Sequence, residues 1–288
     1  MFAVVAAGIL ADTWVPGIPL GAVPDVWNPA RARDFATVLE LPLGGTGEDV
    51  AAMYRTIWHH RPTINGYSGY APPHYAKLMA ALANRDDTTF DELASDGPLL
   101  VVADKDKGGD WAAFVRGYRG ATPVGEEGRW TFFSLPRRAF APAPCDSEPL
   151  PIAAASDNRG AVALATITDA NRFTWWTSGH PQQIGDTLLL DLGRAARPCA
   201  VVLWQDGFQP FYPYALSAAT SLDGAGWTTV FSGKTGALAI RGALASPVRP
   251  QLAIPLPASP ARFISLRVEQ AREKDPWVVT DIAVKGTR

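Results

Sequence analysis

The order of apolar and polar residues divides the chain into two parts with different periodicities. Between residues 31 and 138, short apolar runs that fit strands alternate with segments whose apolar residues recur every three or four positions, as on one face of a helix. This alternation predicts a small layered α/β domain with a largely parallel sheet. The predicted strands are 35–41, 98–103 and 130–135, and the predicted helices are 48–60, 75–82, 90–94 and 111–115.

The helical spacing disappears after residue 153. Residues 139–152 (AFAPAPCDSEPLPI) are rich in proline and have no periodic pattern, which is typical of a linker. Over 153–288, short alternating or apolar runs are separated by turn residues at fairly regular intervals, and this predicts an antiparallel β-sandwich. The expected fold class is therefore α/β followed by all-β, with domains at 31–138 and 153–288.

The first thirty residues form a separate segment. Met1–Leu10 (MFAVVAAGIL) is an apolar run of about half a membrane span, and Asp12 ends it. Two interpretations stay open: a buried strand or short core helix, or the end of a membrane helix whose remainder is encoded upstream of Met1. No basic residue precedes Arg31, so a secretory signal is not indicated. Four prolines between residues 16 and 29 then predict a stiff connector.

Charge and cysteine content exclude several classes of protein. The 26 basic and 28 acidic residues give a net charge of −2, so no basic field is present that would attract nucleic acid. No stretch of about 20 apolar residues occurs, so the sequence contains no complete transmembrane helix. Cys145 and Cys199 are the only cysteines and the four histidines are scattered, which argues against a zinc site. A disulfide between the two cysteines and two free thiols both remain possible.

Several short motifs of the second half follow one another in a recognisable order. They are DANRFTWWTS at 169–178, QIG at 183–185 with LDLG at 190–193, YP at 212–213 with SLDG at 221–224 and Trp227, ARFI at 261–264, and VTDI at 279–282. Together they resemble the discoidin (coagulation factor type C) domain, whose β-sandwich is shared with the family 32 carbohydrate-binding modules. The resemblance implies an eight-stranded, jelly-roll-like sandwich. Trp176 and Trp227 are expected to pack in its core.

The first half has a second, less distinctive resemblance. The segments VLELPLG at 38–44, His59-His60, NGYSGY at 65–70 and PLLVVAD at 98–104 are similar to the extracytoplasmic tail of bacterial multi-pass membrane glycosyltransferases. Those enzymes use a lipid-linked sugar donor and keep their catalytic carboxylates far N-terminal of this tail. The resemblance therefore implies a chain without catalytic residues, on the periplasmic or cell-surface side of a membrane and tethered to it.

A structural calcium site is implied by the discoidin resemblance. In that family the ion ties the loop before the Thr-x-Trp motif to the final strand, and calcium prefers oxygen ligands. The matching residues here are Asp169, Asn171, Thr174 and Asp281, the last of which stands where the family usually has Glu. The alternative is an ordinary hydrogen-bonded Asx loop.

Glycan recognition by the rim loops of the sandwich is the second candidate function of this half. Sugar sites combine an exposed aromatic platform with polar groups. In an extended segment Trp175 points away from the core residue Trp176, with His180 and Gln182 nearby. The loop that follows residue 203 is dense in aromatic side chains, and its candidate sugar contacts are Trp204, Asp206, Phe208, Phe211 and Tyr212. The alternative is that these residues pack against the first domain or a partner protein.

An enzymatic function would have to use the α/β domain. Asp104, Asp106 and Asp110 follow the apolar strand 98–103, at the end of the sheet where such domains bind ligands. Lys105 and Lys107 stand among them, so a solvated, self-neutralising turn is the preferred interpretation. No Gly-x-Ser-x-Gly, P-loop or His-Glu-x-x-His motif is present. We expect a non-catalytic carbohydrate-binding module, the alternatives being a protein-interaction module and a carbohydrate-active enzyme.

Overall fold

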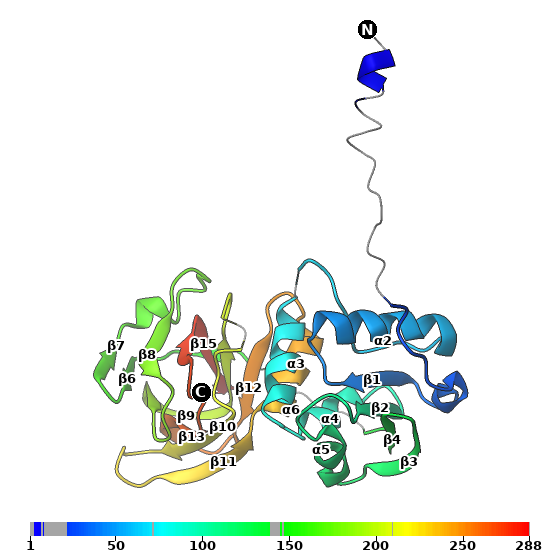
Figure 1. Ribbon diagram of the computed structural model, residues 1–288. Helices are drawn as coiled ribbons and strands as arrows, with labels where there is room; N and C mark the ends of the chain where they lie inside the picture. The colour runs from blue at the N-terminus through cyan, green and yellow to red at the C-terminus, as the bar shows by residue number, and fades with distance from the viewer. Residues whose placement is uncertain are drawn as a thin grey trace.

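The computed structural model describes residues 3–6, 8, 22–70, 72–138, 145, 147–208 and 210–287. In this range the chain forms an α/β domain and a β-sandwich that lie side by side (Figure 1). Half of the apolar stub at 1–10 and half of the predicted linker at 139–152 fall outside the described residues. Residues 3–6 of the stub are helical and exposed, with Val4 76% and Val5 53% exposed, which does not fit a buried strand or core helix. The end of a longer membrane helix stays a prediction.

The α/β domain is built on a four-stranded sheet of order β1-β2-β4-β3. Strands β1 and β2 are parallel, but β4 is antiparallel to both β2 and β3. The expectation of a largely parallel sheet was wrong, because β3 and β4 form a hairpin that turns at Gly128 with φ +54°. The elements are η1 Pro29–Ala32, β1 Thr37–Leu41, α2 Thr46–His59, α3 Pro73–Ala83, α4 Thr89–Leu93, β2 Leu99–Asp104, α5 Trp111–Gly117, β3 Thr122–Glu127 and β4 Trp130–Leu135.

Both faces of this sheet are covered. All six residues of β2 are buried, as its continuous apolar sequence predicts. Leu39 and Val101 pack on one face against side chains of α3, α4 and α5, whereas Val38 and Val102 pack on the other against Trp27. Trp27 also stacks on His59 of α2, with ring centroids 5.2 Å apart.

In the second half, all strand pairs are antiparallel over the described residues, as the pattern predicts. The 18-residue strand β9 joins two sheets: Thr187–Ala196 pairs with β13, and Arg197–Trp204 pairs with β15. Eleven strands are described where the resemblance implied eight. They are β5 Pro149–Leu150, β6 Ala154–Asp157, β7 Gly160–Val162, β8 Trp176–Pro181, β9 Thr187–Trp204, β10 Ala215–Ser221, β11 Thr228–Lys234, β12 Gln251–Pro255, β13 Ala261–Gln270, β14 Pro276–Val279 and β15 Asp281–Thr287, with the short helix η2 at Leu164–Thr166.

The core of the sandwich contains one of the two predicted tryptophans. Trp176 is buried and packs edge-on against Trp277, at a centroid distance of 5.3 Å. Trp227 is 40% exposed in the β10–β11 hairpin, so its predicted core position was wrong. Its indole Nε1 donates to the Gly224 carbonyl at 3.1 Å, which holds the ring over the turn.

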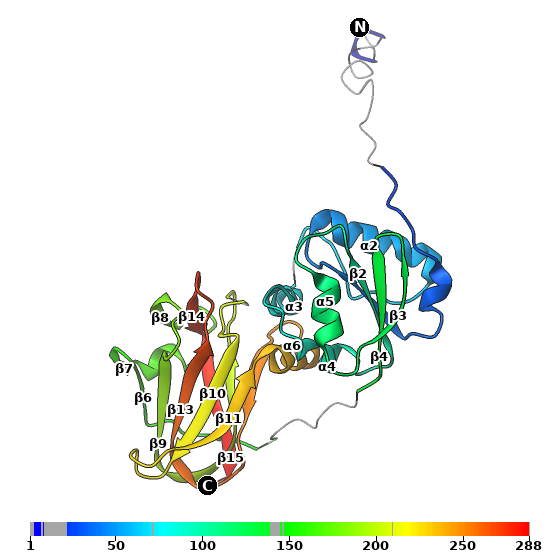
Figure 2. The same ribbon diagram turned by 60° about the horizontal axis from the view of Figure 1, so that its bottom comes forward.

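A helix within the second half was not expected. Helix α6, Gly236–Ala245, lies between β11 and β12 and packs on α3 and α4 of the α/β domain (Figures 1 and 2). Ile240 belongs to the core of the α/β domain, and Ala239 belongs to the core of the sandwich. The expectation that helical segments end at residue 153 was therefore wrong. The helix sequence GALAIRGALA consists mainly of small residues and gives a weak apolar stripe.

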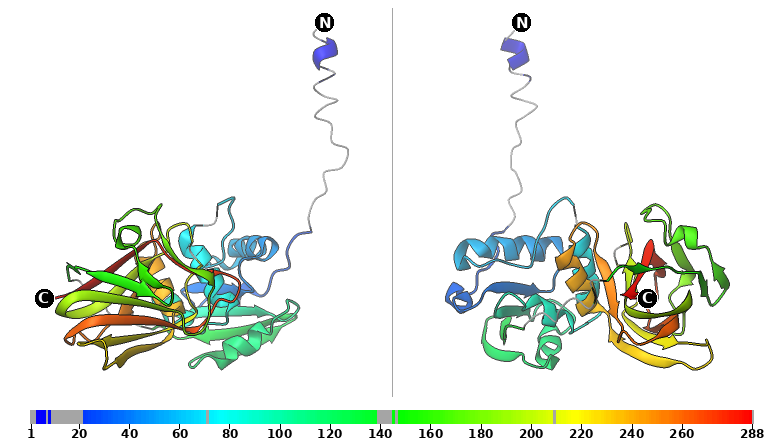
Figure 3. Two further views of the ribbon diagram at one scale, coloured as in Figure 1. Left: turned by 90° about the vertical axis from the view of Figure 1, so that its left-hand side faces the viewer. Right: turned by 180° about the vertical axis from the view of Figure 1, so that it is seen from behind.

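Helix α6 is capped by side chains of the other domain. Gly236 N donates to Asp86 Oδ2 at 2.7 Å, and Ala237 N donates to Thr88 Oγ1 at 3.0 Å. A Cβ on Gly236 would lie 2.4 Å from Asp86 Oδ2, so a larger residue here would displace the Asp86 carboxylate from the helix N-terminus. Arg241 of the helix also pairs with Glu92 at 2.5 Å. Both domains thus contribute to one folded unit, with α3 and α6 at the junction (Figure 3).

A completely buried lysine lies at the same junction. Lys77 Nζ donates to Gln205 Oε1 at 2.8 Å and lies 4.6 Å from the ring centre of Tyr212. Burial lowers the pKa of Lys77 to about 7, although the nearby carboxylate of Asp206 opposes this shift. Around neutral pH the interface therefore holds a lysine that has lost much of its preference for the charged form.

The structure pairs Cys145 with Cys199 in a disulfide, with the two Cα atoms 5.7 Å apart. Of the two possibilities that the sequence left open, the disulfide is the one observed. It attaches the segment between the domains to strand β9.

We expect wild type to gain stability relative to Lys77→Met as the pH rises from 7 to 10. Between the folded pKa of about 7 and the ordinary value of 10.5, the unfolded chain binds more protons than the folded chain, so the free energy of unfolding rises with pH. The gain is of order 4 kcal/mol. Tyr212, whose pKa is raised by burial, stays neutral in this range. The measurement is the free energy of unfolding in urea, determined for both proteins between pH 7 and pH 10. If this free energy changed with pH in the same way in both, Lys77 would not lose its proton in the folded chain.

Candidate functional site

A groove of about 610 Å³ lies at the rim of the sandwich where it meets the α/β domain. Its sandwich side is formed by two loops, one before β8 and one after β9, with Phe173, Trp175 and Phe208. Its other side is formed by Tyr70 and Pro73, at and before the start of α3. The groove therefore depends on how the two domains are docked.

Aromatic rings form the floor and rim of the groove. Trp175 is 47% exposed whereas its neighbour Trp176 is buried, as the alternation of an extended segment predicts. The rings of Trp175 and Phe208 are 5.2 Å apart at 57°, and Phe211 continues the row at 5.9 Å from Phe208. Tyr70 on the opposite side is 70% exposed. Such a row offers flat apolar faces to a ligand.

Charged groups border these rings. Asp206 accepts hydrogen bonds from Arg249 Nε at 2.9 Å and from Thr280 Oγ1 at 3.0 Å, so its carboxylate is firmly held. The Arg249 guanidinium also lies over the ring of Trp204, 5.2 Å from its centre. Arg172 lies over Phe173 at 5.0 Å and has no acidic partner within the described ranges. Its guanidinium is available to a ligand.

Only part of the predicted sugar-binding set lies in this groove. Trp175, Asp206 and Phe208 line it, and Trp204 and Phe211 adjoin it through the contacts above. His180 lies in a separate small hollow beside Trp176, where its ring approaches Asp186 at 3.8 Å.

Two predicted contacts are buried structural residues. Gln182 is 3% exposed, because its amide bridges Arg272 N and the Pro276 carbonyl. Tyr212 is 1% exposed beneath Lys77, where its hydroxyl donates to the Lys77 carbonyl at 3.5 Å. Neither side chain can contact a ligand in this arrangement, so both assignments are corrected.

Four side chains of the groove and its border were not predicted from the sequence. Arg172 and Phe173 stand inside the DANRFTWWTS motif, and their exposure follows from the polar loop around them. Arg249 precedes β12 and gives no local signal. Tyr70 lies about 105 positions before Trp175, and no single-sequence pattern joins them.

The predicted calcium ligands form a hydrogen-bonded loop beside the last strand. Asp169 accepts from Thr174 Oγ1 at 2.9 Å and from Asn171 N at 3.0 Å. Ile282 N donates to the Ile167 carbonyl at 2.7 Å, which brings the start of β15 to this loop. Burial and the charge of Asp169 raise the pKa of Asp281, although Arg249 at 3.3 Å opposes this.

The side chains of Asp169, Asn171, Thr174 and Asp281 offer oxygen ligands, two of them carboxylates, and a hard cation such as calcium prefers ligands of this kind. The guanidinium of Arg249 already supplies one positive charge to Asp281. Over the described part of the chain, no group of three or more His, Cys, Asp and Glu side chains could hold a metal ion. A site built largely from carbonyl and hydroxyl oxygens would not form such a group.

Two of the three aspartates in this segment have structural partners: Asp104, the last residue of β2, and Asp110 in the turn that follows it. Asp104 accepts from Asp106 N at 3.0 Å and pairs with Arg129 at 3.2 Å. Asp110 caps α5 by accepting from Ala113 N at 3.1 Å. Lys105 and Lys107 pair with glutamates outside this turn, Glu126 and Glu48.

None of the described helices is both long and apolar enough to cross a membrane.

About half of the chain is structurally similar to carbohydrate-binding modules of known structure. No family model and no curated protein matches the sequence. Among solved structures, the family 32 carbohydrate-binding module of AlyQ, in complex with 4,5-unsaturated mannuronic acid, is 20% identical; the match covers 48% of this chain and 97% of that one, with a TM-score of 0.35.

Two further matches are of the same kind. Chitosan-binding module 1 from the chitosanase/glucanase of Paenibacillus sp. IK-5 is 16% identical, with 49% of this chain and 99% of that one covered and a TM-score of 0.37. The family 32 module of C. perfringens NanJ, in complex with galactose, is 13% identical over 45% of this chain and 90% of that one, with a TM-score of 0.35.

Proposed function

We propose that this chain is a carbohydrate-binding accessory module that holds a glycan in the aromatic groove and breaks no bond. The observation that carries the proposal is the exposed ring of Trp175 beside Phe208, facing a cavity of about 610 Å³. A pocket of several hundred cubic ångströms accommodates a short oligosaccharide.

The chemistry of the groove suits a sugar. The C–H faces of a pyranose ring pack on indole and phenyl rings, which removes apolar surface from water. Its hydroxyls need donors and acceptors at the edge of that contact, and Arg172 supplies donors on one side. Asp206 can accept a hydroxyl hydrogen with the lone pairs that Arg249 and Thr280 do not use.

Trp175→Ala should weaken glycan binding at least tenfold, because the mutation removes the half-exposed indole ring that packs beside Phe208 in the groove. An array of neutral and acidic oligosaccharides, followed by calorimetry with the best ligand, measures this. Trp227→Ala is the matched control, since Trp227 is similarly exposed but lies in the β10–β11 hairpin. Unchanged binding in the Trp175 variant, or an equal loss in the control, would contradict the proposal.

We also propose that calcium binds at the loop of Asp169, Asn171 and Thr174 together with Asp281. The ion would tie this loop to β15 and neutralise the repulsion between Asp169 and Asp281. The role of the ion would be structural, because the loop that it fixes connects η2 to β8. Trp175 directly precedes β8, so the ion would also help to hold Trp175 in place.

Addition of 5 mM calcium should raise the melting temperature above that measured with chelator, because a ligand bound only by the folded chain stabilises it. At about 100 times the dissociation constant the gain is roughly 2.7 kcal/mol. Asp169→Asn should abolish the shift. The control is Asp223→Asn, which removes a carboxylate from another hydrogen-bonded turn of the sandwich. An equal melting temperature with calcium and with chelator would leave the Asx loop as the better description.

The placement we propose is extracytoplasmic and at a membrane surface, as a region that accompanies a membrane glycosyltransferase. The disulfide supports an oxidising compartment. Helix α2 supports the membrane surface, because its outer face exposes Val50, Met53, Ile57 and Trp58. Asp25, on the N-terminal side of the α/β domain, contacts this helix, because Arg55 Nη1 donates to the Asp25 carbonyl at 2.9 Å.

Ile57→Glu in α2 should reduce co-sedimentation of the chain with phosphatidylglycerol–phosphatidylethanolamine vesicles, because a charge replaces an apolar side chain that is 61% exposed. Leu222→Glu is the control, since Leu222 is 58% exposed in a hairpin of the sandwich. Equal sedimentation of the two variants would argue against α2 as the membrane-facing surface.

A further inference from the structure

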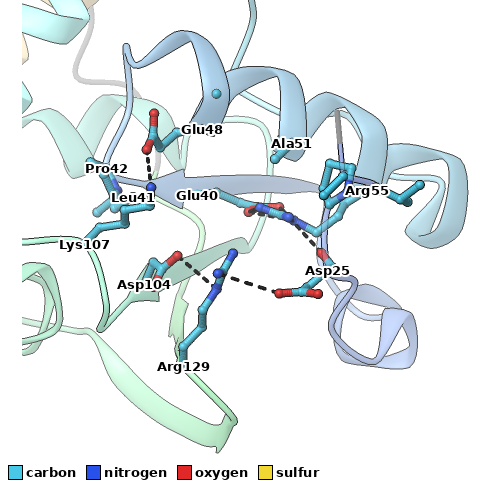
Figure 4. A pocket seen from close by; sticks show the side chains of 14 residues that line it. Asp25, Glu40, Leu41, Pro42, Glu48, Ala51, Arg55, Asp104, Lys107 and Arg129 are labelled. Carbon is cyan, nitrogen blue, oxygen red and sulfur yellow. Dashed lines mark hydrogen bonds and ion pairs between the residues drawn. The ribbon is translucent and has the colours of Figure 1, made fainter. Parts of the chain in front are cut away.

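A second cavity, of about 360 Å³, lies within the α/β domain (Figure 4). Strands β1 and β2 are parallel, with Leu41 beside Ala103, so their carboxyl ends meet at one edge of the sheet. The cavity opens at this edge, which is where α/β sheets bind ligands. The beginning of α2 flanks it on one side, and the segment 22–25 forms a wall on another.

Three acid–base pairs line this cavity. Glu40 at the end of β1 pairs with Arg55 of α2 at 2.6 Å, and both side chains are at least nine-tenths buried. Figure 4 shows the other two pairs across the opening, Glu48 with Lys107 at 2.6 Å and Asp104 with Arg129 at 3.2 Å. These charged groups come from α2, the ends of β1 and β2, the loop after β2 and the β3–β4 hairpin, so the fold assembles them from distant parts of the sequence.

The buried pair is held rigidly. Arg55 Nε and Nη2 both donate to the Glu40 carboxylate, and Nη1 donates to the Asp25 carbonyl at 2.9 Å. The Glu40 backbone is fixed in turn by Asn65, whose amide accepts from Glu40 N at 2.7 Å and donates to Glu40 O at 2.9 Å. The floor of the cavity is therefore preorganised.

Hydrogen-bonding capacity remains in these pairs. The contacts above use three of the five N–H groups of Arg55, and the described residues supply no further hydrogen bond to the other two. Arg129 Nε is buried and makes only the long ion pair with Asp104. Each carboxylate also has more lone pairs than donors around it. Both donors and acceptors are thus available to a ligand in the cavity.

We propose that this cavity binds a neutral polyhydroxylated ligand, a sugar residue, and that it is a second carbohydrate site independent of the aromatic groove. Each hydroxyl of a vicinal diol both donates and accepts, so a diol matches a carboxylate beside a guanidinium. The apolar side chains of Leu41, Pro42 and Ala51 face the same space and suit the C–H groups of the ring.

The charge balance favours a neutral ligand. Four carboxylates, including that of Asp25, and three cations line the cavity, and each cation already has an acidic partner. An anion would meet the excess of carboxylates, and a cation would have to separate existing pairs. A sugar can insert its hydroxyls without breaking the buried pair.

Ala51→Leu provides the test, because it adds three carbons at the cavity wall and leaves every ion pair in place. Val50→Leu is the matched control on the same helix, since Val50 is exposed to solvent. Both changes are made in the Trp175→Ala background, so that the groove does not contribute. Saturation-transfer NMR and calorimetry are performed with methyl glycosides of galactose, mannose, glucose and arabinose.

We expect one of these glycosides to bind the Val50→Leu variant as it binds the parent protein, and to bind the Ala51→Leu variant at least tenfold more weakly. Arg129→Gln, which keeps a donor but removes the charge, should weaken binding less than Ala51→Leu does. Absence of binding for all four glycosides at 10 mM, or equal binding in the Ala51 and Val50 variants, would overturn the proposal. Tighter binding of inorganic phosphate that is sensitive to Ala51→Leu would overturn the assignment to a neutral ligand.

Discussion

The arrangement of this molecule depends on the two hydrogen bonds that the N-terminus of helix α6 donates to Asp86 and Thr88. A cap of this kind contributes about 1 kcal/mol, and a negative charge at a helix N-terminus adds to it. Here the capped helix and the capping residues belong to different domains, so the same free energy also docks the domains. Burial of Ile240 in the α/β core adds roughly 2 kcal/mol to that docking. If the two domains were not docked, Tyr70 and Trp175 would not line the same groove.

Burial of Lys77 at the domain interface costs free energy, but it also restricts how the two domains can pack together. An ammonium group without water is destabilising, and only Gln205 and the ring of Tyr212 compensate Lys77 in close contact. Gln205 Nε2 itself has no hydrogen-bond partner among the described residues. An apolar residue at 77 would give a more stable but less selective contact, because hydrophobic surfaces tolerate shifts that a buried hydrogen bond does not.

Local pattern predicted what depends on local physics. The run 98–103 predicted a strand covered on both faces, and the alternation at Trp175 and Trp176 predicted one exposed and one buried ring. The pattern failed where a contact between distant residues decides the outcome. Helix α6 consists of small residues whose partners lie about 150 positions earlier, and Tyr212 looked like a rim residue although Lys77 covers it. The Tyr70 side of the groove and the cavity beside Glu40 are likewise assembled only by the tertiary fold.

The two candidate sites respond differently to domain docking. The cavity beside Glu40 is lined by residues 22–129 alone, so separation of the domains would leave its ion pairs intact. The groove has walls from both domains, and a ligand that touches Tyr70 and Trp175 together binds only the docked form. By linkage, such a ligand must stabilise the docking to the extent that docking improves its affinity. The cap on α6 would therefore contribute to the binding of the proposed glycan, although it lies outside the groove.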